Sequence, residues 1–313
     1  MNQNLSEYQS ILLKVFKHFA DFCSNNGIQY YAAYGTMIGA IRHKGFIPWD
    51  DDMDVFMKRK DYDRFITLRK TVDKPYKIAT YLDGYSPYPY AKYYTTEGTI
   101  WEFAHFPFVY GPWLDIFPLD ECNGSKDNAA LEAYHYATWK YRKAIAYASW
   151  KEIGYDLFCG KILRAAIKTI KKTRYAPFRN RYIRQIKIAE DLFRAGQGNS
   201  LVDYSGAIVN EVFSKSWFDS TLQVPFEDTV ISIPNGYHQY LSYLYGDYMQ
   251  LPPEGERKIH IPYFIDLKHS LTIEEIQNRY KSQLIDKQSL PLRTILDELR
   301  HRAKGWKSSR IKE

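Results

Sequence analysis

Four carboxylates crowd one short segment, because Asp50, Asp51, Asp52 and Asp54 lie within five positions. Such a concentration of negative charge is unfavourable unless a multivalent cation lies among the carboxylates. If residues 52–57 form a strand, Asp52 and Asp54 point to one face, while the apolar residues between and after them point into a core. Carboxylates placed in this way are typical ligands of Mg²⁺ or Mn²⁺, with phosphate oxygens completing the coordination shell.

Small and cationic residues precede the acids. Gly35 and Thr36 follow the apolar run 28–32 and open a short helical pattern. A glycine lets the backbone approach a phosphate, and the amides at a helix N-terminus attract anions, so a phosphate group is expected here. Positive charge between this loop and the acids comes from Arg42, His43 and Lys44. The combination suits phosphoryl transfer, which depends on positioning and charge neutralisation.

Known acidic and nucleotide-binding loops fit this segment less well. An EF-hand loop starting at Asp50 would require glycine at the position of Val55 and prefers glutamate at that of Asp61. A Walker A loop and a G-x-G-x-x-G loop are both absent from the sequence. A solvated acidic turn is the remaining alternative, although Pro48 and Trp49 on one side and an apolar strand on the other enclose this one.

Residues 35–54 read GTMIGAIRHKGFIPWDDDMD. This run resembles the signature of the LicD family, nucleotidyltransferase-like phosphotransferases that include the fukutin-related proteins. The resemblance continues at residues 111–119 (GPWLDIFPL) and within residues 224–257, so that it covers residues 1–120 and 200–262. It implies an α/β fold, more closely an α+β mixed sheet in a nucleotidyltransferase-like core.

The resemblance also implies an activity. A CDP-activated donor, most often CDP-choline, gives phosphocholine to a hydroxyl of a cell-surface glycan or its lipid-linked precursor, and CMP is released. Asp52 and Asp54 would hold Mg²⁺ or Mn²⁺, and Asp115 would complete the site. The donor phosphates would be held by Gly35, Thr36, Arg42, His43, Lys44 and Lys92.

For Asp115 and Lys92, and for a further catalytic candidate, His260, other interpretations are open. Asp115 lies in the apolar run 113–117, where an ionised carboxylate is costly unless it is metal-bound or paired, so a salt bridge or a helix cap is the alternative. Lys92 lies in a strand-like run, where a lone lysine is more often an exposed edge charge. His260, in a loop, is a candidate for proton transfer or a plain surface residue.

Choline is a quaternary cation, so its recognition requires aromatic faces with a carboxylate nearby. Aromatic residues that could form such a cage fall around the acids, with Glu97 and Glu102 as counter-charges. The cage candidates are Trp49, Tyr90, Trp101, Tyr110 and Trp113.

The elements that must position these groups follow from periodicity. The first helix is expected to begin at a capping box of Ser6 and Gln9 and to end at Gly27. A mixed sheet is indicated by strand-like runs at 76–81, 90–94, 99–103, 113–117, 217–218 and 230–233. Further helices are expected at 61–72, 129–149, 160–170, 182–194, 237–245, 272–281 and 292–303.

The chain is expected to divide into four sections. These are the first part of the catalytic core (1–125), a basic and aromatic helical insertion (126–199), the return to the core with an active-site loop (200–268), and accessory C-terminal helices (269–313).

The insertion contains an unusual run of charge. Residues 161–187 include ten Lys or Arg and no Asp or Glu, and apolar Ile162, Leu163, Ala166, Ile167 and Ile170 fall on one helical side. This pattern is typical of a helix on an anionic membrane surface. A helix packed on the core is an equal alternative. Nucleic-acid binding is not expected, because no nucleic-acid module accompanies the net charge of +7.

Composition sets the remaining bounds. With 45% hydrophobic and 17% aromatic residues, 313 residues can bury a substantial core. No apolar run approaches about 18 residues, and the first nine residues do not resemble a signal peptide. A cytoplasmic location, at the inner face of the membrane if the basic helices bind lipid, is expected. Cys23, Cys122 and Cys159 indicate neither a disulfide framework nor a zinc site.

Two other classes of function stay open at this stage. The chain could be a nucleotidyltransferase that acts on another acceptor, nucleic acid included, or a non-catalytic carbohydrate-binding relative. The intact acids argue against the second class. The sequence leaves open the donor head group, the acceptor hydroxyl, the number of metal ions and the oligomeric state.

Overall fold

The chain divides into two units, residues 1–270 and residues 271–313. The computed structural model describes residues 2–104, 106–124, 128–146, 157, 160–205, 211–257 and 262–280. His260 and the expected helix 292–303 therefore lie outside the described residues. In the second unit the described helix is α9 (Ile273–Arg279), which begins with the expected capping box of Thr272 and Glu275.

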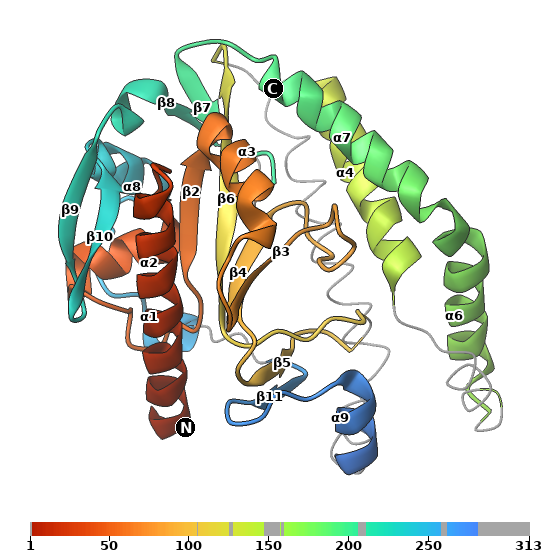
Figure 1. The fold of residues 1–313 in the computed structure, drawn as a ribbon. Helices are drawn as coiled ribbons and strands as arrows, with labels where there is room; N and C mark the ends of the chain where they lie inside the picture. Colours follow the sequence, from red (N-terminus) through yellow and green to blue (C-terminus); the bar gives the residue numbers. More distant parts are fainter. Residues whose placement is uncertain are drawn as a thin grey trace. The chain divides into compact units, whose positions relative to one another are not determined.

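A mixed sheet organises the first unit (Figure 1). Its strands are β1 (Tyr31–Ala32), β2 (Asp54–Lys58), β3 (Tyr76–Ala79), β4 (Ala91–Thr95), β6 (Trp113–Cys122), β7 (Ser200–Val202) and β8 (Val212–Ser214). The order is β1-β2-β6-β4-β3, and the far end of β6 pairs with β7, which pairs with β8. Only the pairing of β2 with β6 is parallel among these strands. The expectation of an α+β mixed sheet is confirmed.

Two short antiparallel pairs accompany this sheet. They are the hairpin of β9 (Thr221–Phe226) with β10 (Thr229–Pro234), and β5 (Thr99–Trp101) with β11 (Phe264–Asp266). The hairpin corrects one expectation, because residues 217–218 belong to the 3₁₀-helix η4 (Lys215–Phe218) and the strand begins at Thr221 instead. The remaining short helices are η2 (Leu68–Lys70), η3 (Ala176–Phe178) and η5 (Glu254–Glu256).

Helices cover both faces of the sheet. On one face lie α1 (Asn2–Asn25) and α3 (Arg59–Thr67), whose Phe19 and Phe65 rings pack edge-on to each other and around Tyr93 of β4. On the other face lie α2 (Tyr34–Ile38), the π-helix η1 (Gly39–His43) and α8 (Tyr237–Tyr245). There Phe56 of β2 contacts the rings of Tyr34 and Tyr240.

Helix α1 does not begin where expected. It starts at Asn2, so Ser6 lies inside the helix and the predicted capping box is wrong. Gln9 has a different role, since its Nε2 donates to the carbonyl oxygens of Ile47 at 3.3 Å and Asp50 at 2.8 Å. The side chain predicted to cap a helix therefore holds the acidic loop.

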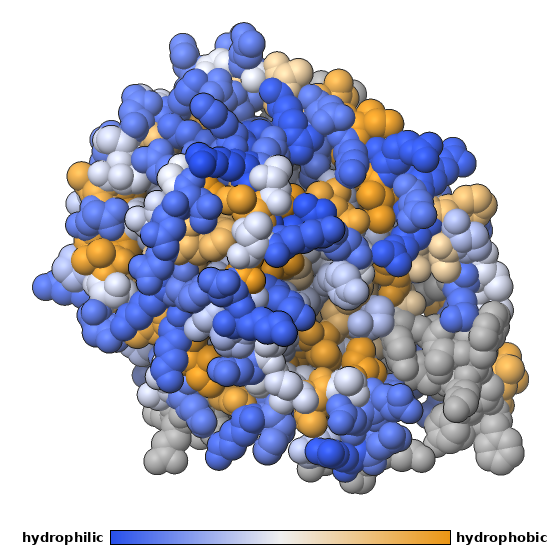
Figure 2. Space-filling view, in the orientation of Figure 1, coloured by the Kyte–Doolittle hydropathy of each residue, from blue (hydrophilic) through white to orange (hydrophobic). Residues whose placement is uncertain are grey.

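A separate layer of helices packs beside the sheet. It contains α4 (Asn128–Ile145), α6 (Ile162–Arg174) and α7 (Arg179–Arg194), and α4 and α7 lie side by side (Figure 1). Its core includes Tyr134, Tyr141 and Ile186. Apolar and hydrophilic side chains are interspersed on its outer surface (Figure 2). In the described part of the chain, no helix is both long and apolar enough to cross a membrane.

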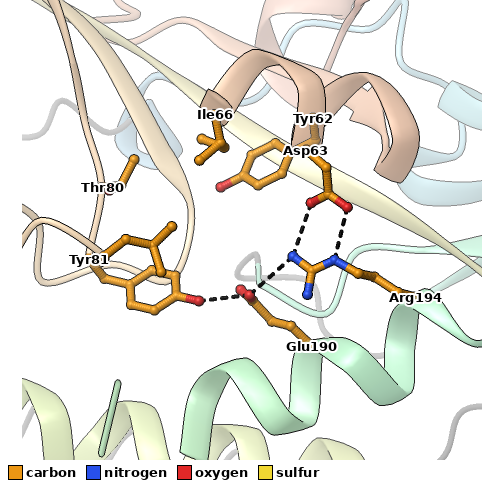
Figure 3. Close-up of a pocket in the computed structure, with 8 residues that line it drawn as sticks. Tyr62, Asp63, Ile66, Thr80, Tyr81, Glu190 and Arg194 are labelled. Carbon is orange, nitrogen blue, oxygen red and sulfur yellow. Dashed lines mark hydrogen bonds and ion pairs between the residues drawn. The ribbon is translucent and has the colours of Figure 1, made fainter. Parts of the chain in front are cut away.

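Charged residues tie this layer to the sheet. Arg59 of α3 donates from Nε and Nη2 to Asp120 of β6, at 2.6 Å each, and Asp120 is fully buried. Arg194 of α7 donates to Asp63 of α3 at 2.9 and 3.0 Å and lies 3.6 Å from Glu190 (Figure 3). A cavity of about 200 Å³ lies beside this network. The buried Arg59–Asp120 pair and the partly exposed Arg194–Asp63 pair thus join three elements that are distant in sequence.

Replacing Arg59 by methionine should lower the free energy of unfolding by about 3–5 kcal/mol, because it leaves the buried carboxylate of Asp120 without its cation. Urea denaturation followed by circular dichroism measures this change. Lys17→Met is the control: Lys17 pairs with Asp228 on an exposed surface, where water and salt screen the attraction, so stability should hardly change. Equal losses in the two variants would contradict a stabilising role for the buried pair.

Candidate active site

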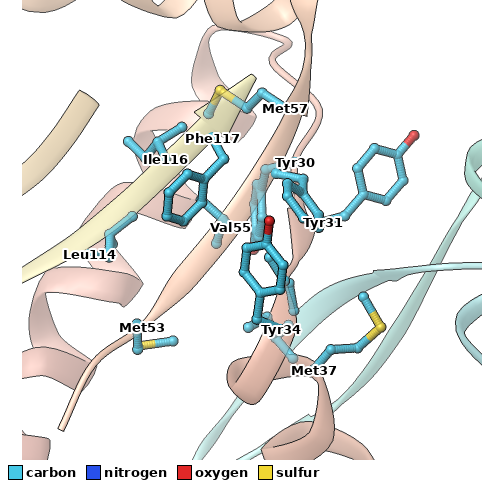
Figure 4. Close-up of a cluster of buried hydrophobic side chains, with 14 of the residues drawn as sticks. Tyr30, Tyr31, Tyr34, Met37, Met53, Val55, Met57, Leu114, Ile116 and Phe117 are labelled. Atoms are coloured by element: carbon cyan, nitrogen blue, oxygen red, sulfur yellow. The ribbon is translucent and has the colours of Figure 1, made fainter. Parts of the chain in front are cut away.

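Strand register brings two acids and a lysine into one row. Asp54 of β2 is paired with Asp115 of β6, and Asp115 is paired with Lys92 of β4. Residues paired across neighbouring strands point to the same face of a sheet, so the three side chains share the face that α2 and α8 cover. The residues that follow the acids belong to the core, where Val55 and Ile116 are fully buried (Figure 4).

Three further acids lie in the loop that leads into β2. One carboxylate oxygen from each of Asp50, Asp51 and Asp52 lies within 4.8 Å of the others, and all three side chains are half-buried. Strand β2 begins at Asp54, two residues later than expected, so Asp52 belongs to this loop cluster and not to the strand. Oxygen ligands grouped in this way suit a hard divalent cation.

The expected phosphate loop contacts the acids directly. The hydroxyl of Thr36 accepts a hydrogen bond from the backbone N–H of Asp54 at 2.8 Å, so Thr36 fixes the start of β2. A Cβ on Gly35 would lie 3.0 Å from Oδ2 of Asp50, so this glycine gives the carboxylate its space. Because a bare phosphate beside Asp50 would be repelled, Gly35 can serve a phosphate only when a cation lies between the two.

Tyr34, the residue before Gly35, is held in an unusual backbone conformation. Tyr34 has a φ of 44°, which is costly for a residue with a side chain. Its hydroxyl donates to the buried Asp203 at 2.8 Å, and its ring packs against Phe56 and Phe117. These contacts fix the turn that presents Gly35 and Thr36 to the acids.

The acids disfavour one another's ionisation. Burial first, and then the charges of Asp52, Asp115 and Asp50, raise the pKa of Asp54 well above its usual value. Burial raises the pKa of Asp115 to about 6, although the neighbouring Lys92 opposes the shift. A cation bound among these acids would relieve the repulsion that Asp54 and Asp115 experience.

Lys92 is buried and not an exposed edge charge. It is 1% exposed, and its Nζ lies 2.8 Å from Oδ1 of Asp115 and 3.9 Å from Oε2 of Glu102. Its ammonium also lies 4.6, 5.7 and 4.3 Å from the centres of three aromatic rings, those of Tyr88, Tyr90 and Trp113. Lys92 is thus an internal counter-charge for Asp115, and two of the expected cage residues surround this lysine.

The other expected cage residues are also engaged. Trp101 is buried and donates from Nε1 to the carbonyl of Phe106 at 2.7 Å. Tyr110 is buried and donates from its hydroxyl to the carbonyl of Tyr85. Trp49 is half-buried, with the guanidinium of Arg257 4.5 Å from its ring centre.

The expected phosphate-binding cations separate into two groups. Nη1 of Arg42 donates to the carbonyls of Tyr248 and Gln250, at 2.8 and 2.9 Å, and its Nε donates to His43 at 2.9 Å. Burial lowers the pKa of Arg42, and burial together with Arg42 lowers that of His43. This pair therefore braces residues 248–250, whereas Lys44 is exposed.

The loop between these cations and the acids is clamped from the β9–β10 hairpin. Glu227 donates from its backbone N–H to the carbonyl of Lys44 at 2.8 Å, and its Oε1 accepts from the N–H of Phe46 at 2.9 Å. A Cβ on Gly45 would lie 2.1 Å from that oxygen, and a Cβ on Gly39 would lie 2.5 Å from the carbonyl of Gly45. Only glycine fits at these two close approaches.

Two tyrosines near the acids escaped the sequence interpretation. Tyr245, at the end of α8, is 39% exposed as a whole residue, whereas its hydroxyl is desolvated; this desolvation and then the charges of Asp54, Asp50 and Asp52 raise its pKa. Tyr8 of α1 is buried beside the acids, and burial is again the main cause of its raised pKa. Tyr245 opens the run YGDYMQLPP, one of the stretches that carries the family resemblance, so a signal for it existed.

Similarity to known proteins assigns the chain to the transferases of the nucleotidyltransferase type. The family described as "LicD/FKTN/FKRP, nucleotidyltransferase domain" matches residues 27–149, which include the acids and Lys92. The lipopolysaccharide cholinephosphotransferase LicD of Haemophilus influenzae is 30% identical over 268 residues, which cover 82% of this chain and 95% of that protein. The chain belongs to the LicD family, and the predicted membership and transferase class are confirmed.

Shorter matches connect the chain with two uncharacterized proteins. One, from Rickettsia typhi, is 36% identical over 58 residues, or 18% of this chain and 19% of that protein. The other, from Rickettsia prowazekii, is 38% identical over 50 residues, or 16% of this chain and 19% of that protein.

Replacing Lys92 by methionine should make the protein less stable as the pH rises. The pKa of Asp115, about 6 in the folded protein, lies above its ordinary value of 3.8, so its ionisation already costs stability as pH rises through this interval. Loss of the ammonium raises the pKa of Asp115 further. Each additional unit by which this pKa is raised lowers the free energy of unfolding by about 1.4 kcal/mol once the carboxyl is ionised.

Melting temperatures near about pH 5 and about pH 8 measure this effect, with Lys77→Met, an exposed lysine of β3, as the control. The melting temperature of Lys92→Met should fall more than that of the control between the two values. An identical pH dependence in both variants would show that Lys92 does not compensate Asp115.

Proposed function

We propose that this protein transfers phosphocholine from CDP-choline to a hydroxyl of a glycan, with release of CMP. The observation that carries the proposal is the 30% identity with a lipopolysaccharide cholinephosphotransferase over 95% of that protein's length. The row of Asp54, Asp115 and Lys92 beside the acidic loop supports it, because phosphoryl transfer needs charge neutralisation and a fixed geometry.

Mg²⁺ or Mn²⁺ is proposed as the cofactor, held by Asp52, Asp54 and Asp115, with Asp50 and Asp51 proposed as further ligands because they lie in the same cluster as Asp52. The donor set fits: clustered, half-buried carboxylates are the ligands that these ions prefer, and burial together with the charges of Asp52, Asp115 and Asp50 raises the pKa of the neighbouring Asp54. When bound, the ion supplies positive charge that offsets the charge of the donor phosphates.

Asp115 is proposed as the group that orients and deprotonates the acceptor hydroxyl. Its hydrogen bond from Lys92 fixes Oδ1 and with it the orientation of the carboxylate, and a general base requires such a fixed geometry. The hydroxyl oxygen attacks the choline-bearing phosphorus, the bond from this phosphorus to the bridging oxygen breaks, and CMP leaves with that oxygen. The hydroxyl proton passes to Asp115.

The aromatic residue that we propose for choline differs from those predicted from the sequence. Since Tyr90 and Trp113 surround Lys92, they already hold a cation. Tyr245 combines an exposed ring with the charges of Asp50, Asp52 and Asp54, the pairing of ring and carboxylate that a quaternary ammonium requires. We therefore assign the head group to Tyr245. His260 as a second proton carrier, and Lys44 as a ligand of the donor phosphates, stay predictions.

Replacing Asp54 by asparagine should lower turnover by roughly 100-fold or more, the scale of losing one electrostatic group from a catalytic site. Without added metal the variant should melt at a higher temperature near neutral pH. The raised pKa means that the folded state favours the neutral carboxyl, and asparagine mimics that form.

CMP release and thermal melting test both outcomes, and Asp73→Asn, an exposed acid, is the control that should change neither. Turnover at the level of the natural protein in Asp54→Asn would remove the acid from the proposed site.

The donor is tested by mass spectrometry of CMP released from CDP-choline, CDP-ethanolamine, CDP-glycerol and CDP-ribitol in the presence of a glycan acceptor. CDP-choline should react fastest. Tyr245→Leu should raise the KM for CDP-choline by roughly tenfold, because a desolvated cation–π contact contributes up to about 2 kcal/mol, while CMP binding should not change.

Tyr243→Leu is the matched control, since this exposed tyrosine lies two residues earlier on α8. Faster release from CDP-glycerol or CDP-ribitol would refute the choline assignment, because neutral polyols need hydrogen-bond partners. Labelling of RNA by a nucleoside triphosphate without any CMP release would refute the transferase assignment itself.

A further inference from the structure

Helix α6 turns its apolar side outward. Ala165 is 1% exposed and marks the side that packs on the protein, where Arg164 and Lys168 are half-buried. On the opposite side Leu163, Ile167 and Ile170 are between 44% and 64% exposed, and Ile162 at the start of the helix is 67% exposed. A helix packed on a core does the reverse and buries its apolar stripe. Contiguous exposed apolar stripes of this kind mark interaction surfaces.

Positive charge surrounds this stripe. Within residues 161–187 there are ten Lys or Arg and no acid, and Arg174, Arg181, Arg184 and Lys187 are exposed. A cavity of about 280 Å³ between α4, α6 and α7 is lined by three cations, Lys140, Arg174 and Arg181, together with aromatic rings such as those of Tyr136, Tyr175 and Phe178. Apolar and hydrophilic surface alternate over these helices in Figure 2.

We propose that this surface, called the docking face and made of the α6 stripe with the exposed cations Arg174, Arg181, Arg184 and Lys187, binds an anionic phospholipid bilayer. The stripe would enter the boundary between headgroups and acyl chains, and the cations would lie at the headgroup phosphates. Docking goes beyond the transfer reaction proposed above, because it requires neither the donor nor the acceptor.

The combination of charge and exposed aliphatic side chains favours lipid over two other partners. A second copy of the chain would bring like charges together across the same face, which costs free energy. A nucleic acid would use the cations for its phosphates and the rings for its bases, yet it leaves the aliphatic stripe in water. A bilayer satisfies both features at once.

The test is sedimentation of the full chain with vesicles of phosphatidylethanolamine and phosphatidylglycerol, compared with vesicles of neutral lipids. The protein should bind the anionic vesicles and dissociate as salt is raised, since the screening length falls from about 10 Å at 0.1 M to about 3 Å at 1 M. Equal binding to neutral vesicles would overturn the proposal.

Two variants, each with a matched control, separate the stripe from the charge. Ile167→Glu with Ile170→Glu should lower vesicle partitioning roughly 100-fold, because two side chains no longer leave water. Its control is Leu222→Glu with Val230→Glu, which are 43% and 52% exposed on the β9–β10 hairpin and should have little effect. All four positions are exposed, so circular dichroism should show unchanged folding.

For the charge, Arg181→Gln, Arg184→Gln and Lys187→Gln together should lower partitioning at low salt by roughly 100-fold, given the contribution of each cation near an anionic surface. The control removes the same charge from exposed positions on α3, η2 and β3, with Lys60→Gln, Lys70→Gln and Lys77→Gln. Variants that bind vesicles as well as the natural protein would overturn the proposal.

Other outcomes identify the other partners. If the chain does not bind vesicles and sedimentation velocity shows a dimer that Ile167→Glu with Ile170→Glu dissociates, the face joins two copies and the proposal fails. It fails equally if RNA binds the face and vesicles do not. Vesicle binding by a chain that releases no CMP would keep the docking face and refute the transfer reaction, and the reverse result would refute docking alone.

Discussion

Repulsion among carboxylates at one end of the sheet is the constraint on which the site depends. The register of three strands places Asp54 beside Asp115, and the acidic loop adds three more carboxylates. Within this group the buried ammonium of Lys92 is held at 2.8 Å from Asp115 by the fold itself. Acids held this close together repel one another, and this repulsion is the physical reason to expect divalent cations there.

The backbone around the acids is fixed by contacts from distant parts of the chain. Gln9 of the first helix holds the loop carbonyls, and Thr36 holds the first N–H of β2. Glu227 of a hairpin holds the loop at Gly45 from the other side. Each of these side chains forms hydrogen bonds to backbone groups and thereby fixes the backbone around the acids. The carboxylates can therefore stay close together despite their repulsion.

The local sequence pattern predicted the acids, whereas the environments of Lys92 and Arg42 depend on contacts between residues that are distant in sequence. Asp115 was recognisable because a carboxylate in an apolar strand requires a partner. The alternative of a salt bridge is observed in its pair with Lys92, and its role as a metal ligand stays a prediction. That Lys92 is buried depends on which strand lies next to β4, and periodicity along one strand does not encode this. Likewise, the sequence alone predicts that Arg42 is available to a phosphate. In the structure its guanidinium donates to the carbonyls of Tyr248 and Gln250, about 200 positions away.

Strand β6 connects the site to the helical layer. It carries Asp115 near its start and Asp120 five residues later, so the two side chains point to opposite faces of the sheet, about 17 Å apart along the strand. Asp115 faces the proposed chemistry, whereas Asp120 holds Arg59 of α3, and α3 in turn is joined to α7 through Asp63 and Arg194. The docking face on α6 and α7 is therefore linked to Asp115 through the partly exposed Arg194–Asp63 pair, the buried Arg59–Asp120 pair and one continuous strand. A chain bound to a bilayer by that face would hold its acids at a defined height above the lipid, and this would favour acceptor hydroxyls presented at that height.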